Sequence, residues 1–158
     1  MSEDNPIRVF ATHTFEDNDD YLRVFEYLET VDRFYYLNVS KPENMPASGG
    51  AQAIRDELIA QIKEAEVVVV LPSVYAQSPD LVHIMMDIAK ANKIKMVGIR
   101  PYGGVIDTPP EMVERTAEII EWNDREMVDA IKRLARGEDT ARWEVLDFPG
   151  FDADGPIE

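Results

Sequence analysis

Side chains of the kind that bind sugars and phosphates follow four short apolar runs of this chain. Hydroxyl, imidazole and guanidinium groups hydrogen-bond sugar hydroxyls and phosphate oxygens. If the runs are parallel strands, these side chains gather at one edge of a sheet, where such sheets bind ligands. The sequence therefore predicts a ligand site there. The residues that follow the runs are Thr12, His13 and Thr14, Asn38 and Ser40, Ser73 and Tyr75, and Arg100 and Tyr102.

Five of these residues are the candidate binding residues: His13, Thr14, Ser73, Tyr75 and Arg100. Structural interpretations compete with this one. In them the imidazole hydrogen-bonds a neighbouring backbone group, the serine caps a turn, the tyrosine packs under the next helix and the arginine pairs with an acid. The sequence alone leaves both interpretations open.

Several reactive-site motifs are absent from the sequence. The chain has no cysteine, which excludes thiolate nucleophiles, disulfides and zinc–sulfur sites. It contains no P-loop, no GxGxxG fingerprint and no GxSxG nucleophile elbow. The two histidines, His13 and His83, lack the spacing of metal ligands, so no metal site is predicted.

Apolar runs alternate with segments of helical periodicity along the chain. The run at 67–71 is apolar without alternation, as expected for a strand buried on both faces. Alternating strands and helices predict a three-layer α/β fold. Its five-stranded parallel sheet should have the flavodoxin-like order 2-1-3-4-5, with helices on both faces. The predicted strands span Ile7–Ala11, 34–38, 67–71, 95–100 and 118–122.

Local signals mark the ends of several predicted helices. The acidic run at 17–20 suits an N-cap and a first helical turn, so we interpret it as a helix start and not as a metal site. Ser78 and Pro79 match an N-cap followed by proline at the first helical position. Met85 then belongs to the apolar stripe of that helix, and Gly137 is the predicted end of the last helix.

Length and charge restrict the function classes. The chain has 158 residues, which predicts one domain at 1–137 followed by an acidic, aromatic C-terminal tail at 138–158. The formal net charge of −15 repels phosphate backbones and anionic membranes, so neither nucleic acid nor a membrane is an expected partner. No secretory signal pattern and no membrane-spanning apolar run occurs, which predicts a cytoplasmic location.

Three segments, taken in order, resemble prokaryotic TIR-like domains, the class that includes proteins of Thoeris anti-phage defence. "RVFATHTFEDNDDYLRVFEYL" is similar to their opening strand, its polar turn and the following helix. "EVVVVLPSVYAQSPDLVHIMMDIAKANKIKMVGIRPYG" resembles their middle, with a turn that carries Ser73 and Tyr75 and a strand that ends Gly-x-Arg-Pro-aromatic-Gly. "EIIEWNDREMVDAIKRL" resembles their last strand and helix. The likeness covers roughly residues 7–136.

The resemblance implies NAD as a ligand or substrate, with no further cofactor required. Active members cleave the glycosidic bond of NAD with a glutamate that stabilises positive charge on the ribose. By spacing, Met85 occupies that glutamate's position and Leu81 that of the aromatic residue before it. Asp87 is the nearest acid, but two residues rotate a side chain by roughly 200° around a helix. This rotation predicts that Asp87 faces away from the side on which position 85 lies. If NAD is cleaved, the candidates for the catalytic acid are Asp87, Glu16 and an acid of the tail.

Three functions stay open from the sequence. The first is a TIR-like domain that binds NAD or an ADP-ribose derivative in signalling or defence, with weak or degenerate catalysis. The second is an active NAD hydrolase or cyclase that makes a nucleotide signal. The third is a non-enzymatic interaction module, which forms a homo-oligomer or TIR-type assembly, or binds a protein partner through its tail.

Overall fold

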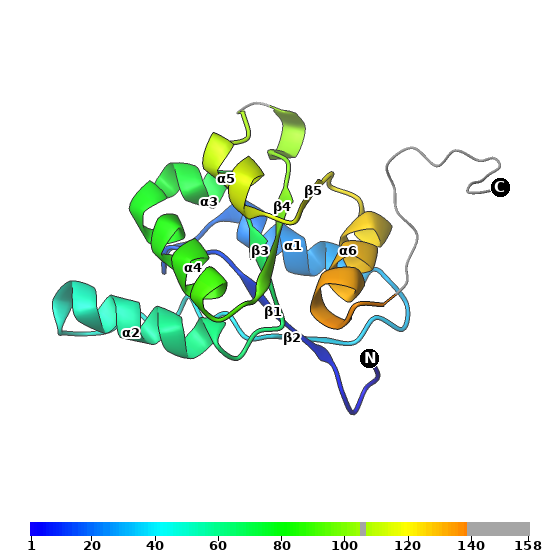
Figure 1. Ribbon diagram of the computed structural model, residues 1–158, viewed down its shortest axis with the longest axis horizontal. Helices are drawn as coiled ribbons and strands as arrows, with labels where there is room; N and C mark the ends of the chain where they lie inside the picture. Colours follow the sequence, from blue (N-terminus) through cyan, green and yellow to red (C-terminus); the bar gives the residue numbers. More distant parts are fainter. Residues whose placement is uncertain (105–106, 139–158) are drawn as a thin grey trace.

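The computed structural model describes residues 1–104 and 107–138. Its five strands form one parallel sheet of order β2-β1-β3-β4-β5, with helices packed on it (Figure 1). The predicted fold class and strand order are confirmed. The predicted tail lies outside the described residues apart from Glu138, so the division at residue 137 stays a prediction.

The strands follow the predicted runs closely, and the central one is completely buried. None of the four residues of β3 has exposed surface, and Leu71, which follows the strand, has none either. The register pairs Val67 with Val9 on one side and with Lys95 on the other. A strand with neighbours on both sides and helices on both faces must be apolar throughout. The strands are β1 Ile7–Ala11, β2 Tyr36–Asn38, β3 Val67–Val70, β4 Lys95–Ile99 and β5 Glu118–Ile120.

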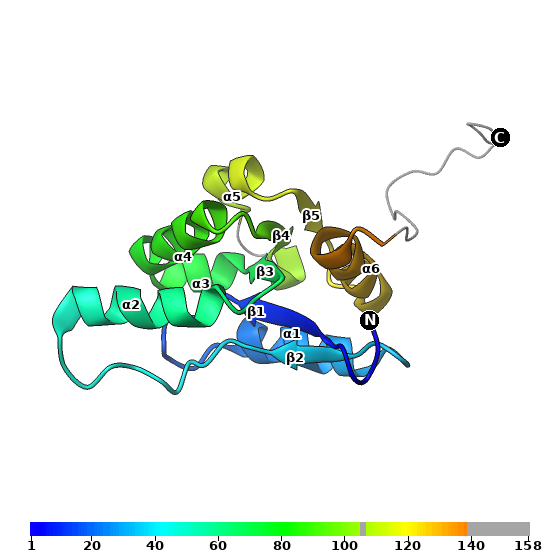
Figure 2. The ribbon, with the colours of Figure 1, turned by 60° about the horizontal axis from the view of Figure 1, so that its bottom comes forward.

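The helices form two layers, because right-handed crossovers place successive helices on one face until the strand order reverses. α2 and α3 pack against α4, and α1 packs against α6 (Figures 1 and 2). No helix among residues 1–104 and 107–138 has the length and apolar character needed to cross a lipid bilayer. The helices are α1 Asp19–Glu29, α2 Gly50–Ile62, α3 Pro72–Gln77, α4 Pro79–Ala91, α5 Pro110–Arg115 and α6 Asp124–Arg136, with a 3₁₀ turn η1 at Tyr102–Gly104.

Predicted helix-end residues lie at the ends of three helices, and two of them make the expected cap. The Asn18 side chain accepts a hydrogen bond from the Tyr21 N–H at 3.0 Å and caps α1. Gly137 ends α6 with a φ of 64°, a left-handed conformation that costs glycine little. Pro79 occupies the start of α4 as predicted, but the Ser78 side chain makes no capping bond.

Two helices were missed by the sequence prediction. The turn with Ser73 and Tyr75 after β3 lies in α3, and α5 lies between β4 and β5, where no helix is predicted. Each of these helices has six residues, fewer than two helical turns, so the apolar pattern does not repeat often enough to reveal them. Each starts with proline at its first positions, which is the signal that remained.

The amino ends of the strands are joined by a charged cluster centred on Glu66. Its carboxylate accepts hydrogen bonds from Arg136 Nη2 at 2.9 Å and from the Arg8 N–H at 3.0 Å. Arg136 also donates to the Pro6 carbonyl at 3.1 Å. The hydrogen bonds from Arg136, more than those from Arg8, hold the pKa of Glu66 below its ordinary value. The cluster therefore ties α6 to the starts of β1 and β3.

We predict that Glu66→Gln lowers the free energy of unfolding by about 2 kcal/mol at pH 7, because a half-buried charged acceptor is lost. The carboxylate's contribution is complete above the ordinary pKa of 4.5 and is lost as the pH falls through the lower folded-state value. Urea denaturation of wild type and variant at neutral and acidic pH measures this. The difference should shrink in acid, whereas Glu64→Gln, two residues earlier and exposed, should change little. An equal loss at both pH values would contradict the prediction.

Candidate functional site

Thr12, directly after β1, belongs to the framework of the carboxyl edge. Its N–H donates to the Val69 carbonyl at 3.0 Å, and its hydroxyl accepts from the Leu71 N–H at 3.1 Å. The side chain has no exposed surface. This residue therefore locks the ends of β1 and β3 together at the point where the strand order reverses.

His13 is buried and both of its ring nitrogens have partners. Nδ1 accepts from the Phe15 N–H at 3.2 Å, which assigns the proton to Nε2. Nε2 lies 3.0 Å from Gln61 Oε1 and donates to it. Burial lowers the pKa of His13, so the ring is neutral near pH 7. In this state the imidazole holds the loop after β1 in place and presents no free nitrogen to a ligand.

Gln61 is a buried residue that the sequence analysis did not single out. Its amide nitrogen donates to the Lys41 carbonyl at 3.1 Å and to Glu57 Oε2 at 2.9 Å. Its oxygen accepts from the Lys41 N–H at 2.8 Å. A polar residue next to Ile62, on the buried side of α2, was the signal that could have identified it. Gln61 links α2 to the loops after β1 and β2.

Thr14 and Ser73 are brought together through two amide side chains. Asn18 accepts from the Ser73 hydroxyl at 3.4 Å and donates to Gln77 Oε1 at 3.1 Å. Gln77 also accepts from the Thr14 hydroxyl at 3.4 Å and donates to the Asp17 carbonyl at 3.3 Å. The loop after β1 therefore lies across α3. Two of the five candidate binding residues share this network.

Tyr75 lies in a different cluster, together with Glu111 and His83. The Tyr75 hydroxyl donates to one oxygen of Glu111, and Nε2 of His83 contacts the other. Side chains of Glu111 and His83 are 38% and 37% exposed, so solvent reaches the carboxylate. The hydrogen bond to Glu111 raises the pKa of Tyr75, which keeps the phenol a donor. Glu111 was missed because α5 was missed, although Pro110 followed by an acid is typical of a first helical turn.

The two acids proposed from sequence lie elsewhere. Asp87 is exposed and pairs with Arg115 at 2.5 Å, while Met85 is fully buried in the core stripe of α4, as predicted. Glu16 is exposed on the loop after β1. Neither forms a hydrogen bond or ion pair with Ser73, Tyr75 or His13, all of which lie in the described part of the chain. Their catalytic roles stay predictions.

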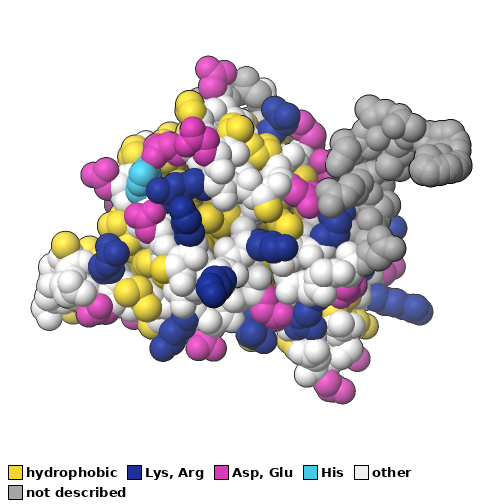
Figure 3. All heavy atoms as spheres, viewed as in Figure 1, with side chains coloured by type: hydrophobic (Ala, Val, Ile, Leu, Met, Phe, Trp, Pro, Cys, Tyr) yellow, Lys and Arg dark blue, Asp and Glu magenta, His cyan; other side chains and the backbone are white. Residues whose placement is uncertain are grey.

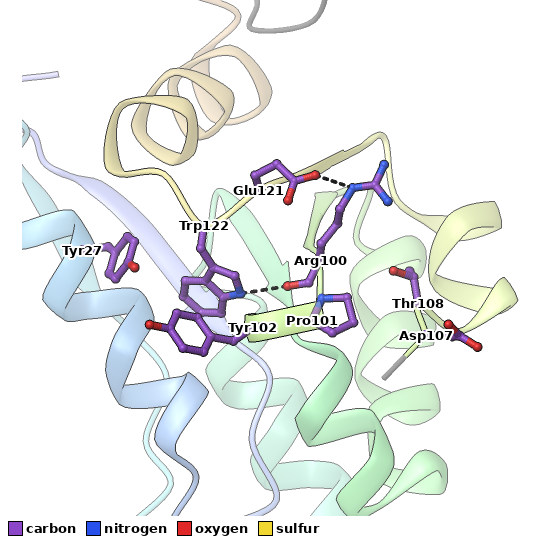
Figure 4. Close-up of a pocket in the computed structure, with 9 residues that line it drawn as sticks. Tyr27, Arg100, Pro101, Tyr102, Asp107, Thr108, Glu121 and Trp122 are labelled. Carbon is purple, nitrogen blue, oxygen red and sulfur yellow. Dashed lines mark hydrogen bonds and ion pairs between the residues drawn. The ribbon is translucent and has the colours of Figure 1, made fainter. Parts of the chain in front are cut away.

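Arg100 stands at a pocket of about 520 Å³ at the carboxyl ends of β4 and β5 (Figure 4). Its guanidinium is 56% exposed and pairs with Glu121 at 2.7 Å. Its carbonyl accepts from Trp122 Nε1 at 2.8 Å, which fixes the indole. The other lining residues are Tyr27, Pro101, Tyr102, Gly103, Asp107 and Thr108.

Three aromatic rings form one wall of this pocket. Trp122 meets Tyr102 edge to face at 5.6 Å between centroids and meets Tyr27 in the same manner at 5.4 Å. The Arg23 guanidinium lies over the Tyr102 ring, 3.8 Å from its centroid. Figure 4 shows the rings on one side and Arg100 with Glu121 on the other. An aromatic wall facing a guanidinium can bind a flat ring that carries an anionic group.

The candidate residues therefore divide into separate groups: His13 in the framework, Thr14 with Ser73, Tyr75 with Glu111, and Arg100 at the pocket. Among residues 1–104 and 107–138, no group of three or more His, Asp or Glu side chains could hold a metal ion. In comparisons with known proteins, no family model matches the chain and no curated protein is significantly similar to it. The likeness to TIR-like domains stays a hypothesis based on the order of the motifs.

We predict that the His13 ring titrates below pH 6.5 in the folded protein, because burial disfavours its charged form. The unfolded chain binds this proton at higher pH. The stabilising contribution is therefore present above pH 6.5 and is lost as the pH falls through the folded value. NMR titration of the ring protons measures the pKa, with His83→Gln to assign the two histidines. A His13 pKa at or above 6.5 would contradict the buried, neutral ring.

Proposed function

We propose that this protein is a TIR-like domain that binds a nucleotide, NAD or an ADP-ribose derivative, in a signalling or defence role. We further propose that it turns the nucleotide over weakly or not at all. The single observation that carries the proposal is the aromatic and guanidinium-lined pocket beyond β4 and β5. The pocket lies on the carboxyl side of the sheet, the side on which α/β sheets of this type bind ligands, but beyond β4 and β5 and not at the switch point between β1 and β3.

The pocket matches a nucleotide in size and chemistry. A volume of about 520 Å³ falls within the range of small-molecule sites, roughly 300–1,000 Å³. Tyr102 is 45% exposed, and the ring surface that Arg23 leaves uncovered suits stacking of a base. The Arg100 guanidinium pairs with Glu121 through Nε, and its outer nitrogens suit a phosphate. The net charge of −15 opposes an anion at long range. Salt screens that field within about 10 Å, so a local guanidinium decides the contact.

Weak turnover is proposed because Met85, at the position where the resemblance places the catalytic acid, is a core residue. Met85 has no exposed surface, and a carboxylate in its place would be desolvated without a partner. Asp87, on the same helix, is already paired with Arg115. Binding without efficient cleavage is the function that these observations favour.

We predict that NAD or ADP-ribose binds the full chain with measurable heat in titration calorimetry. Tyr102→Ala should weaken binding about ten-fold, because stacking on one base contributes about 1–3 kcal/mol. Tyr35→Ala is the matched control, since Tyr35 precedes β2 at the opposite edge of the sheet. Absence of heat for NAD, ADP-ribose and their cyclic forms, or equal affinity of the Tyr102 and Tyr35 variants, would contradict the proposal.

Cleavage of NAD is the second candidate function, and the hydrogen bond between Tyr75 and Glu111 favours it. In this reaction the bond between ribose C1′ and the nicotinamide nitrogen breaks, and its electron pair leaves with neutral nicotinamide. Water adds to C1′ and loses a proton. A carboxylate beside the ribose stabilises the positive charge that develops on it. Glu111 supplies such a group from α5, in place of the apolar Met85.

If purified protein releases nicotinamide from NAD, we predict that Glu111→Gln lowers the rate by about 100-fold, as loss of a charge-stabilising group does. Glu114→Gln, on the same helix, is the matched control. Asp87→Asn and Glu16→Gln test the two acids proposed from sequence in the same assay. Activity that survives Glu111→Gln but is lost in either of the other two variants would reassign the catalytic acid.

A further inference from the structure

A basic pocket lies at the amino edge of the sheet, opposite the proposed nucleotide site. It has a volume of about 360 Å³, and four of the chain's 16 Lys and Arg residues line it. Lys90 lies in the last turn of α4, Lys93 lies between α4 and β4, Lys95 begins β4 and Arg115 ends α5. Against a net charge of −15, this concentration of positive charge sets the pocket apart. The remaining lining residues are Ile94, Met96, Glu114 and Ala117.

The three lysines have no carboxylate partner within the described ranges 1–104 and 107–138. All three are exposed, whereas Arg115 pairs with Asp87. Apolar side chains lie between them: Met96 is 5% exposed and Ile94 is half-buried. Figure 3 shows dark-blue Lys and Arg side chains around hydrophobic atoms near the middle of this face. A ligand for this pocket should combine carboxylates with apolar groups.

The segment 139–158 of the same chain has this composition. It contains six acids, one arginine and three aromatic residues. Acidic and apolar residues are interleaved in the stretch "WEVLDF" at 143–148. Its carboxylates complement the unpaired lysines, and its aromatic and aliphatic side chains complement Ile94 and Met96.

The segment also begins at the correct edge of the sheet. α6 runs antiparallel to the strands, and Arg136 near its end contacts Pro6 and Glu66, which precede β1 and β3. Glu138 lies 3.9 Å from the amino group of Met1 (Figure 1). The ten residues from Glu138 to Phe148, in the middle of the segment, reach up to about 33 Å when extended, whereas one helix layer and two strands span only about 20 Å. Tethering gives an effective concentration near the millimolar range, so weak contacts suffice.

We propose that residues 143–151 dock intramolecularly in the pocket formed by Lys90, Lys93, Lys95 and Ile94, through ion pairs and apolar contact. This interaction is separate from nucleotide binding and does not depend on it. In the docked state the segment covers the pocket at the amino ends of the strands and leaves the carboxyl edge of the sheet accessible. Screening of the ion pairs by salt should weaken docking.

The absence of cysteine allows a direct test in the full chain. Ala153→Cys introduces the only thiol, to which a nitroxide spin label is attached. We predict enhanced NMR relaxation of the amides of Lys93, Lys95 and Ala117 in ¹⁵N-labelled protein. Adding Lys93→Glu and Lys95→Glu should lower that enhancement roughly five-fold or more, since two exposed ion pairs are replaced by repulsion.

The matched control carries Lys41→Glu and Arg55→Glu, two exposed residues outside this pocket, which change the net charge equally. It should retain the enhancement. No enhancement at the pocket, or loss of it in both double variants, would overturn the proposal. A sample that mixes spin-labelled unenriched protein with ¹⁵N-labelled protein tests for contact between copies. Enhancement of equal size in that mixture would also overturn intramolecular docking.

Discussion

Complete burial of β3 is the constraint on which this structure depends. The four valines of this strand lie between β1 and β4 and under helices on both faces, with no exposed surface. Such a strand can exist only if crossover helices cover both faces, and those crossovers require parallel neighbours. The carboxyl ends of the strands then lie at one edge. Thr12 seals the junction there by bonding the backbone at Leu71.

This constraint also explains why the polar residues at the switch point are mostly committed to the fold. Loops that leave buried strands carry backbone groups that need partners. His13 and Gln61 supply those partners to the loops after β1 and β2, and Asn18 supplies one to the first turn of α1. The groups that remain accessible lie further out, at the aromatic pocket and at Glu111. The side chains at this edge that are accessible to a ligand therefore lie at its periphery more than at its centre.

The sequence predicted the strands, their order and most helix ends, because long apolar periods and capping residues are local signals. It missed α3 and α5, since six residues do not show a period. It also could not decide the role of His13. The partner of this imidazole, Gln61, is 48 residues away, and only the fold brings the two together. The polar residues that follow the predicted strands identified a candidate edge of the sheet. Long-range hydrogen-bond partners determine which of those side chains are free to contact a ligand.

A reactive acid on α4 would need a position that faces the Tyr75 turn, but the packing of α4 leaves no such position for an unpaired carboxylate. Position 85 faces the core, where a carboxylate without a partner would cost several kcal/mol. Position 87 faces solvent and Arg115. An acid that serves the Tyr75 turn must therefore come from another element. Glu111 meets that requirement because α5 lies beside β4 and holds the carboxylate between Tyr75 and His83. Any acid catalysis at the Tyr75 turn would therefore depend on α5, the short helix that the sequence did not predict.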